Sequence, residues 1–169
     1  MSATINIQHY KKDAALLTKE LNVIKAVATI EAQVQPLDAW NEQTITDLLS
    51  QDMNRLLIAI KEEKVVGYCL YQQLFEQGEI FRIATHPDYQ RQGIAAQLLE
   101  VLFEALTGQG VESLLLEVRA DNEPAIGLYK RYGFTVIHQR KGYYQAANQA
   151  PMDALIMSCD LNRSEYLAR

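Results

Sequence analysis

The amino-acid sequence predicts an α+β fold, with one mixed, mainly antiparallel sheet of about seven strands flanked by about four helices. Two observations support this prediction. Strand-like patterns recur along the chain, separated by helical patterns and short turns. The run from Ser113 to Val118 is almost continuously apolar, which is typical of a strand buried on both faces and paired in parallel. With 169 residues, 49% of them hydrophobic, the chain fits a single domain, 1–169.

The N-terminal half contains three strand patterns and two helix patterns. Apolar alternation or apolar runs predict strands at 4–8, 56–60 and 65–74, the last two joined by a charged turn at 61–64. A helical pattern runs from Asp13 to about Gln33, in one piece or two. A second helix begins after Asn41, whose side chain is a good N-cap, and reaches Leu49.

The C-terminal half alternates strands and helices. A strand over 80–85 is expected after a turn at Gln77-Gly78, and a helix then extends to about Leu106 before the glycines of 108–110. Asn122 caps a short helix that Gly133 ends. The chain closes with strands at 134–138 and 154–159.

Composition excludes several classes of function. The net charge of −5 argues against a protein that binds nucleic-acid phosphates. Cys69 and Cys159 are too far apart in sequence for a metal motif and are expected to be reduced core thiols, so no metal is predicted. The N-terminus lacks a signal-peptide pattern, and no apolar run reaches the ~18 residues of a membrane span. We therefore expect a cytoplasmic protein with no membrane partner.

The negative charge is concentrated in one segment. Of the 21 acidic residues, five lie between Glu31 and Asn54, a segment without Lys or Arg, and the remaining 16 balance the 16 bases. The segment is either a solvated helix face or an acidic lip that attracts a cationic substrate.

A polar loop with one glycine precedes the helix that reaches Leu106. It reads Gln90-Arg91-Gln92-Gly93-Ile94-Ala95 and follows a strand. The first N–H groups of a helix lack partners and carry partial positive charge, so they bind phosphate or pyrophosphate. Gly93 lets the backbone approach an anion, and Arg91 adds a cation. Alone, the pattern also fits an ordinary turn.

The segments downstream of this loop make the prediction more specific. With Ile83 to Gly93, the segments Leu116-Glu117-Val118-Arg119, Leu128-Tyr129 and Gly142-Tyr143-Tyr144 resemble the GNAT family of N-acetyltransferases. Within that family they are most similar to the RimI-type ribosomal-protein alanine N-acetyltransferases. The similarity is close from about Gly78 to Leu161.

This resemblance implies an enzyme that uses acetyl-CoA as co-substrate and transfers acetyl directly to an amine. The implied acceptor is a protein N-terminus, for the RimI type a basic ribosomal-protein N-terminus. It also implies that backbone groups bind the donor and that a strand N–H serves the oxyanion. The implied donor-binding residues are Ile83, Ala84 and Thr85 on the strand, Arg91, Gln92, Gly93, Ile94, Ala95 and Ala96 in the loop and helix start, and Asn122.

Glu117 is the candidate general base. It follows three leucines, so burial is expected to raise the pKa of its carboxyl, as a base near neutral pH requires. An α-amine with a pKa near ~8 is easier to deprotonate than a lysine near ~10.4. The structural alternative is a strand-end carboxylate paired with Arg119 or Arg82.

Tyr129 is the candidate acid that protonates the departing CoA thiolate. The alternative is a core aromatic beside Ile126 and Tyr132, because aromatics at helical spacing more often pack in a core. Glu117 and Tyr129 together favour an enzyme over a non-catalytic acyl-CoA sensor. A small amine or another protein N-terminus stays open as acceptor.

The loop departs from the family at two positions. Ala95 stands where a second glycine is usual, and Ala96 where a basic residue is usual. The missing cation at Ala96 is expected to weaken contacts with the CoA phosphates.

Overall fold

The computed structural model describes residues 4–10 and 17–163. Its seven strands form one sheet in the order β1-β2-β3-β4-β5-β7-β6. The strands are β1 Asn6–His9, β2 Asn54–Lys61, β3 Lys64–Leu74, β4 Gln77–Thr85, β5 Ser113–Arg119, β6 Thr135–Tyr144 and β7 Met152–Asp160. The α-helices are α1 Leu17–Val34, α2 Glu42–Leu49, α3 Ile94–Thr107 and α4 Glu123–Arg131, and a 3-10 turn, η2, spans Pro87–Tyr89. The predicted α+β fold is confirmed.

The chain divides into two compact units. Unit 1 holds residues 1–72 and 82–102, and unit 2 holds 73–81 and 103–169. Strand β4 and helix α3 therefore contribute residues to both units. The expected start of the first helix at Asp13 lies outside the described residues, and the expected single-domain organisation stays a prediction. No helix in the described part of the chain is long and apolar enough to cross a membrane.

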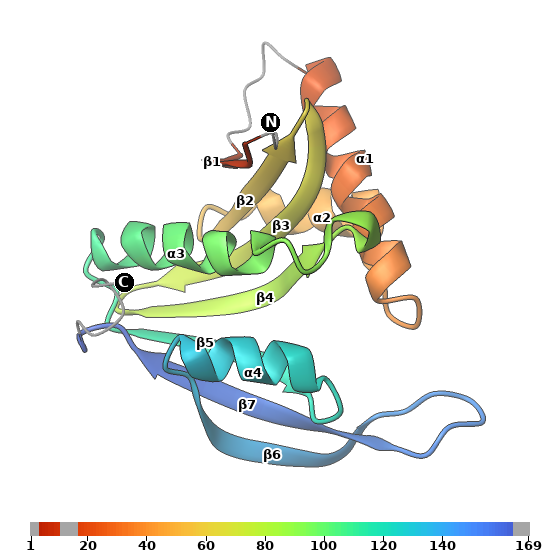
Figure 1. The fold of residues 1–169 in the computed structure, drawn as a ribbon, viewed down its shortest axis with the longest axis vertical. Coiled ribbons are helices and arrows are strands. Elements are labelled where there is room, and N and C mark those ends of the chain that lie inside the picture. Colours follow the sequence, from red (N-terminus) through yellow and green to blue (C-terminus); the bar gives the residue numbers. More distant parts are fainter. Residues whose placement is uncertain (1–3, 11–16, 164–169) are drawn as a thin grey trace. The chain divides into compact units, whose positions relative to one another are not determined.

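Unit 1 is built on antiparallel strands. β1 pairs with β2, and β2 pairs with β3. Glu62 and Glu63 form the β2–β3 turn with φ of 50° and 62°, which suits a two-residue hairpin. In Figure 1, α3 lies in front of β2 and β3 and α2 lies behind them. The core between these layers contains apolar side chains such as Leu57, Leu70 and Leu98.

Helix α2 begins where the sequence predicts. The side chain of Asn41 accepts from the backbone N–H of Thr44 at 2.9 Å, as an N-cap does. Ile45, one turn into the helix, is buried. This cap fixes the residue at which the α1–α2 loop ends and α2 begins.

Unit 2 surrounds β5. This strand runs parallel to the start of β4, with Ile80 opposite Leu116, and antiparallel to β7. The parallel pairing is as predicted, but burial on both faces is wrong. Leu114, Leu116 and Val118 are buried, whereas the alternate residues, which include Glu117, are only half-buried. The reason is that the second face carries charged side chains, which keep access to water.

Two further expectations about unit 2 are corrected. The turn before β4 lies at Phe75 and Glu76, with Phe75 at a φ of 52°, and Gln77 already belongs to the strand. Strand β6 extends to Tyr144 instead of ending at His138. Two register shifts against β7 interrupt the alternation of its side chains between the two faces of the sheet. A search for residues that alternate with a period of two therefore does not detect the full strand. Figure 1 shows α4 in front of β5 and β7.

Candidate functional site

Unit 1 carries the expected donor-binding loop. Ile83, Ala84 and Thr85 form the half-buried end of β4, and η2 follows directly. Gly93 has a φ of 79°, and a Cβ there would meet nothing within 4 Å. The space in front of this backbone is therefore open, as a bound phosphate requires. With this positive φ, glycine is also the residue least strained at position 93.

The start of α3 supplies free backbone donors to that space. The first bond of the helix runs from the N–H of Gln97 to the carbonyl of Gly93 at 3.0 Å. The N–H groups of Ile94, Ala95 and Ala96 precede it and have no acceptor four residues back within the helix. These residues fit the phosphates of CoA by their chemistry.

Two residues hold this helix start against the sheet. The side chain of Ile94 is buried, so only its backbone can serve a ligand. A Cβ added to Gly67 on β3 would lie 2.9 Å from Cγ2 of Ile94 and 3.1 Å from the carbonyl of Ala84. The absence of a side chain at Gly67 lets the strand, helix and β4 pack closely.

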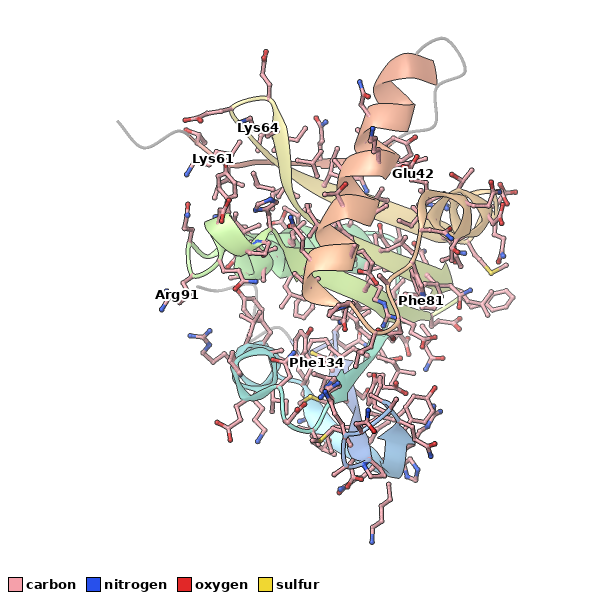
Figure 2. All side chains as sticks on the ribbon, turned by 90° about the vertical axis from the view of Figure 1, so that its right-hand side faces the viewer. Glu42, Lys61, Lys64, Phe81, Arg91 and Phe134 are labelled. Atoms are coloured by element: carbon pink, nitrogen blue, oxygen red, sulfur yellow. The ribbon has the colours of Figure 1, made fainter. Side chains whose placement is uncertain are left out.

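A lysine from the β2–β3 hairpin contacts the same loop. Nζ of Lys61 donates to Oε1 of Gln92 at 3.0 Å and lies 5.6 Å from the ring centroid of Tyr89. Arg91, between these two residues, is exposed and has a φ of 61°. Figure 2 shows Lys61 and Lys64 at the hairpin and Arg91 on the loop. No pattern in the sequence pointed to Lys61 as a contact of this loop.

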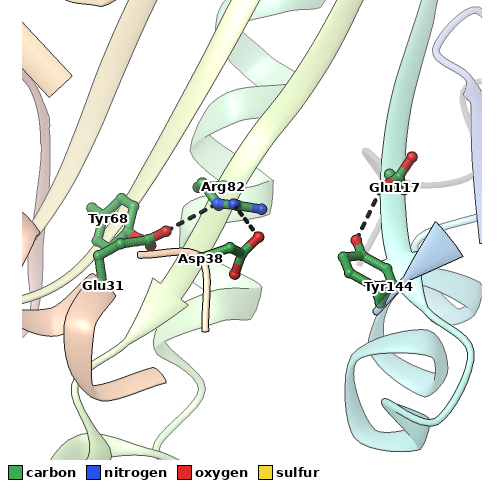
Figure 3. Close-up of polar contacts among 6 residues, drawn as sticks. All are labelled: Glu31, Asp38, Tyr68, Arg82, Glu117 and Tyr144. Atoms are coloured by element: carbon green, nitrogen blue, oxygen red, sulfur yellow. Dashed lines mark hydrogen bonds and ion pairs between the residues drawn. The ribbon is translucent and has the colours of Figure 1, made fainter. Parts of the chain in front are cut away.

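Unit 2 carries Glu117, whose carboxylate has a defined set of donors. The hydroxyl of Tyr144 donates to Oε1 at 2.9 Å, and Nη1 of Arg140 donates to Oε2 at 3.1 Å. Figure 3 draws the tyrosine contact. The side chain is 27% exposed, so one part is held while another reaches solvent. This combination suits a group that exchanges a proton.

Glu117 forms its ion pair with Arg140, which is neither of the two arginines that the sequence suggested as partners. Arg119 pairs with Asp121 at 2.8 Å, and Arg82 pairs with Glu31 and Asp38. Arg140 lies 23 residues from Glu117 in sequence and is brought to it by β6, whose full length the sequence pattern did not reveal.

A second carboxyl lies on the same strand face as Glu117. Glu79 on β4 is opposite Leu115, two residues before Glu117 on β5. Partial burial raises the pKa of Glu79, the negative charge of Glu117 raises it further, and Arg140 opposes both. Sequence reasoning missed Glu79, because only the parallel register places it beside β5.

Tyr129 and Asn122 lie at the two ends of α4. The side chain of Asn122 accepts from the N–H of Ala125 at 3.3 Å, which confirms the predicted cap. Tyr129 is 7% exposed, and its ring meets Phe134 edge-on at 5.7 Å between centroids. It is thus packed in the core of unit 2, and its role as an acid stays a prediction.

The acidic segment is partly neutralised within unit 1. Glu31 is 1% exposed and accepts from the hydroxyl of Tyr68 and from Nε of Arg82, the latter at 3.0 Å. Arg82 also binds Asp38 at 2.9 Å and lies 4.5 Å from the ring centroid of Trp40. Glu31 therefore belongs neither to a solvated face nor to a lip open to substrate. Figure 3 shows the contacts of Arg82 with Glu31 and Asp38.

Acidic side chains elsewhere do not gather into a metal centre. Across residues 4–10 and 17–163, no group of three or more His, Cys, Asp or Glu side chains is placed to hold a metal ion.

Known proteins resemble this chain in both sequence and fold. An alanine N-acetyltransferase of ribosomal protein bS18 from Escherichia coli is 36% identical over 124 residues, which are 73% of this chain and 82% of that protein. The crystal structure of the ribosomal-protein-S18-alanine N-acetyltransferase from Escherichia coli matches with a TM-score of 0.81 and 30% identity, covering 94% of both chains. A GNAT family acetyltransferase from Elizabethkingia anophelis, solved with acetyl-CoA bound, shares the fold with a TM-score of 0.69 and 18% identity, covering 92% of this chain and 97% of its own.

The family assignment rests on a match to a family model. The model of the acetyltransferase (GNAT) family matches residues 24–134, well over half of the sequence. Those residues include the loop before α3, Glu117 on β5 and Tyr129 on α4. The chain is therefore an acetyltransferase and belongs to the GNAT family.

Proposed function

We propose that this enzyme transfers the acetyl group of acetyl-CoA to the N-terminal α-amine of a ribosomal protein, with the alanine N-terminus of bS18 as the first candidate. The relatives named for that reaction support the proposal, at 34% and 36% identity over 73% of this chain. A ribosomal-protein acceptor implies a cytoplasmic enzyme. The observation that supports the proposed chemistry most is the half-buried carboxylate of Glu117, which accepts one hydrogen bond on each oxygen.

Glu117 is proposed to accept the proton of the acceptor amine, directly or through one water. Tyr144 and Arg140 each bind one of its oxygens and fix the orientation of the carboxylate. Each oxygen keeps a second lone pair for the incoming proton. A fixed acceptor at hydrogen-bond distance is the first requirement for general-base catalysis.

The loop before α3 is proposed to hold the phosphates of the donor. The free N–H groups of Ile94, Ala95 and Ala96 and the open space at Gly93 support this role. Ile83, Ala84 and Thr85 are proposed to bind the pantetheine arm through their backbone, and one of their N–H groups to stabilise the oxyanion. Acetyl-CoA supplies the activated acyl group when bound.

Tyr129 is proposed to return a proton to the sulfur of the leaving thiolate. Its position in the core limits its motion, which favours a fixed donor. Asn122 is proposed to contact CoA in addition to its capping of α4.

The test is an acceptor panel with acetyl-CoA, in which thiol release is measured and the products are identified by mass spectrometry. We expect the highest kcat/KM with a peptide that carries the bS18 N-terminus, and no product when its α-amine is blocked. Acetylation of lysine side chains in the blocked peptide, or a preference for a small amine, would contradict the proposed acceptor. Absence of thiol release with all acceptors would favour the acyl-CoA sensor.

A further inference from the structure

The loop before α3 carries few cations of its own. Arg91 is the basic residue between η2 and Gln97, and Ala95 and Ala96 at the helix start carry no charge. Lys61 of the β2–β3 hairpin brings a further positive charge to the loop, because its ammonium group donates to Oε1 of Gln92 at 3.0 Å. The loop therefore receives a second positive charge from another strand.

The charge of Lys61 is not balanced by a carboxylate. Arg82, Arg119 and Arg140 each form an ion pair. Lys61, by contrast, has no ion-pair partner within the described residues, although Glu62 and Glu63 follow it in the turn. It contacts a neutral amide oxygen and an aromatic ring instead. Such contacts fix an ammonium group without neutralising it, and leave N–H donors for an anion.

We propose that Lys61 binds a phosphate group of the acyl donor, as a residue of the CoA site that the loop sequence does not contain. The inference rests on the proposed binding of CoA at this loop and deepens it. The phosphate is either the pyrophosphate, which the helix start would also bind, or the 3′-phosphate of the nucleotide. Both are recognised by the same chemistry, a positioned cation beside free backbone N–H groups.

Calorimetric titration of CoA and of 3′-dephospho-CoA into wild-type protein and into Lys61→Met tests this assignment. Methionine keeps the length of the side chain but removes the charge. We expect a Kd for CoA about fivefold higher in the variant, the loss of one charge-assisted contact at a partly exposed site. Lys61→Arg should bind CoA nearly as wild type does.

Lys64→Met is the matched control. Lys64 lies directly opposite Lys61 in the hairpin register and carries the same charge, but it is exposed and makes no contact with the loop among the described residues. Its substitution should leave the Kd for CoA within twofold of wild type, since exposed charges without contact are strongly screened. If both variants lost the same affinity for CoA, only the overall positive charge of the hairpin would matter, and the proposal would be overturned.

The two ligands distinguish the two phosphates. A loss confined to CoA assigns the 3′-phosphate to Lys61. A loss with both ligands, accompanied by a weaker salt dependence of binding in Lys61→Met, assigns the pyrophosphate. An unchanged Kd, or a loss with unchanged salt dependence, would mean that Lys61 only shapes the loop. Failure of the wild-type protein to bind CoA at all would refute the proposed function itself.

Discussion

Two carboxylates in this molecule have the same kinds of partner and different environments. Glu31 in unit 1 accepts from a tyrosine hydroxyl and an arginine, Tyr68 and Arg82. Glu117 in unit 2 also accepts from a tyrosine hydroxyl and an arginine, Tyr144 and Arg140. The side chain of Glu31 is 1% exposed and that of Glu117 is 27% exposed.

Hydrogen-bond partners alone therefore do not identify a reactive carboxylate. Glu31 is closed off from solvent, and the pKa of Tyr68 beside it is raised, first by burial and then by the charge of Glu31. A group so little exposed has no open face for a substrate amine. Glu117 combines fixed orientation with access to solvent. We therefore expect removal of the Glu31 carboxylate to lower the stability of the protein, and removal of the Glu117 carboxylate to lower its enzymatic activity.

The largest difference is expected in turnover. Glu117→Gln removes the proposed base and should lower kcat by about 10²–10⁴, with little change in the Kd for CoA. Glu31→Gln should keep kcat per folded molecule within about threefold. Steady-state assays, corrected for the folded fraction by circular dichroism, measure both. If Glu117→Gln retains wild-type turnover from pH 6 to 9, its role as base is wrong.

Stability should fall more in Glu31→Gln than in Glu117→Gln. Glu31→Gln removes the buried partner of Arg82, which among the described residues keeps only the exposed carboxylate of Asp38, and should lower the free energy of unfolding by about 3 kcal/mol. Glu117→Gln breaks a partly exposed pair and should cost less than about 1 kcal/mol. Urea titration gives both values. Should Glu31→Gln fail to fold, the milder Asp38→Asn variant tests the same cluster, with an expected loss below about 1 kcal/mol.

The two tyrosines sharpen the comparison. Tyr68→Phe deprives a buried carboxylate oxygen of its donor and should cost about 1–3 kcal/mol of stability with normal kcat. Tyr144→Phe should leave stability within about 1 kcal/mol and lower kcat by about tenfold, because Glu117 loses the contact that orients Oε1. Equal effects of the two substitutions on kcat would contradict the assignment of Glu117 as the reactive carboxylate and of Glu31 as a structural one.

The smallest effect concerns Glu79 and depends on pH. Its raised folded-state pKa means that the unfolded chain ionises first as pH rises, so the native protein loses stability across that interval. Glu79→Gln should therefore be slightly more stable than wild type at pH values above the folded-state pKa, by less than ~1 kcal/mol for this solvated side chain. The difference should vanish well below the ordinary glutamate pKa of about 4.3, where both states are protonated. In a Glu117→Gln background the gain should shrink, because one cause of the shift is gone.

Local signals in the sequence predicted the parts of the fold that local chemistry determines. Asn41 and Asn122 cap their helices as expected, because a capping side chain bonds only two or three residues away. The loop with Gly93 also marked the start of α3, although Ile94 and Ala95, which were expected in the loop, already belong to the helix. The apolar run of β5 predicted its parallel pairing, although the burial on both faces that the same run predicted is wrong.

The polar partners could not be predicted, because they depend on register between distant strands. Arg140 reaches Glu117 only because β6 continues past a register shift, and Glu79 lies beside β5 only through the parallel register of β4. Lys61 approaches the loop from a hairpin 31 residues away from Gln92. Side-chain identities were visible in the sequence, but these neighbours were not.

The register shifts in β6 also bear on how the protein avoids aggregation. β6 is the last strand of the sheet, and it exposes Val136 and Ile137, the latter 58% exposed. A long, regular edge strand with apolar side chains is a template for pairing with other chains. The bulges distort this edge, and Arg140 and Lys141 place positive charge along it. The irregularity that gives Glu117 its arginine thus also makes the sheet a poor nucleus for fibrils.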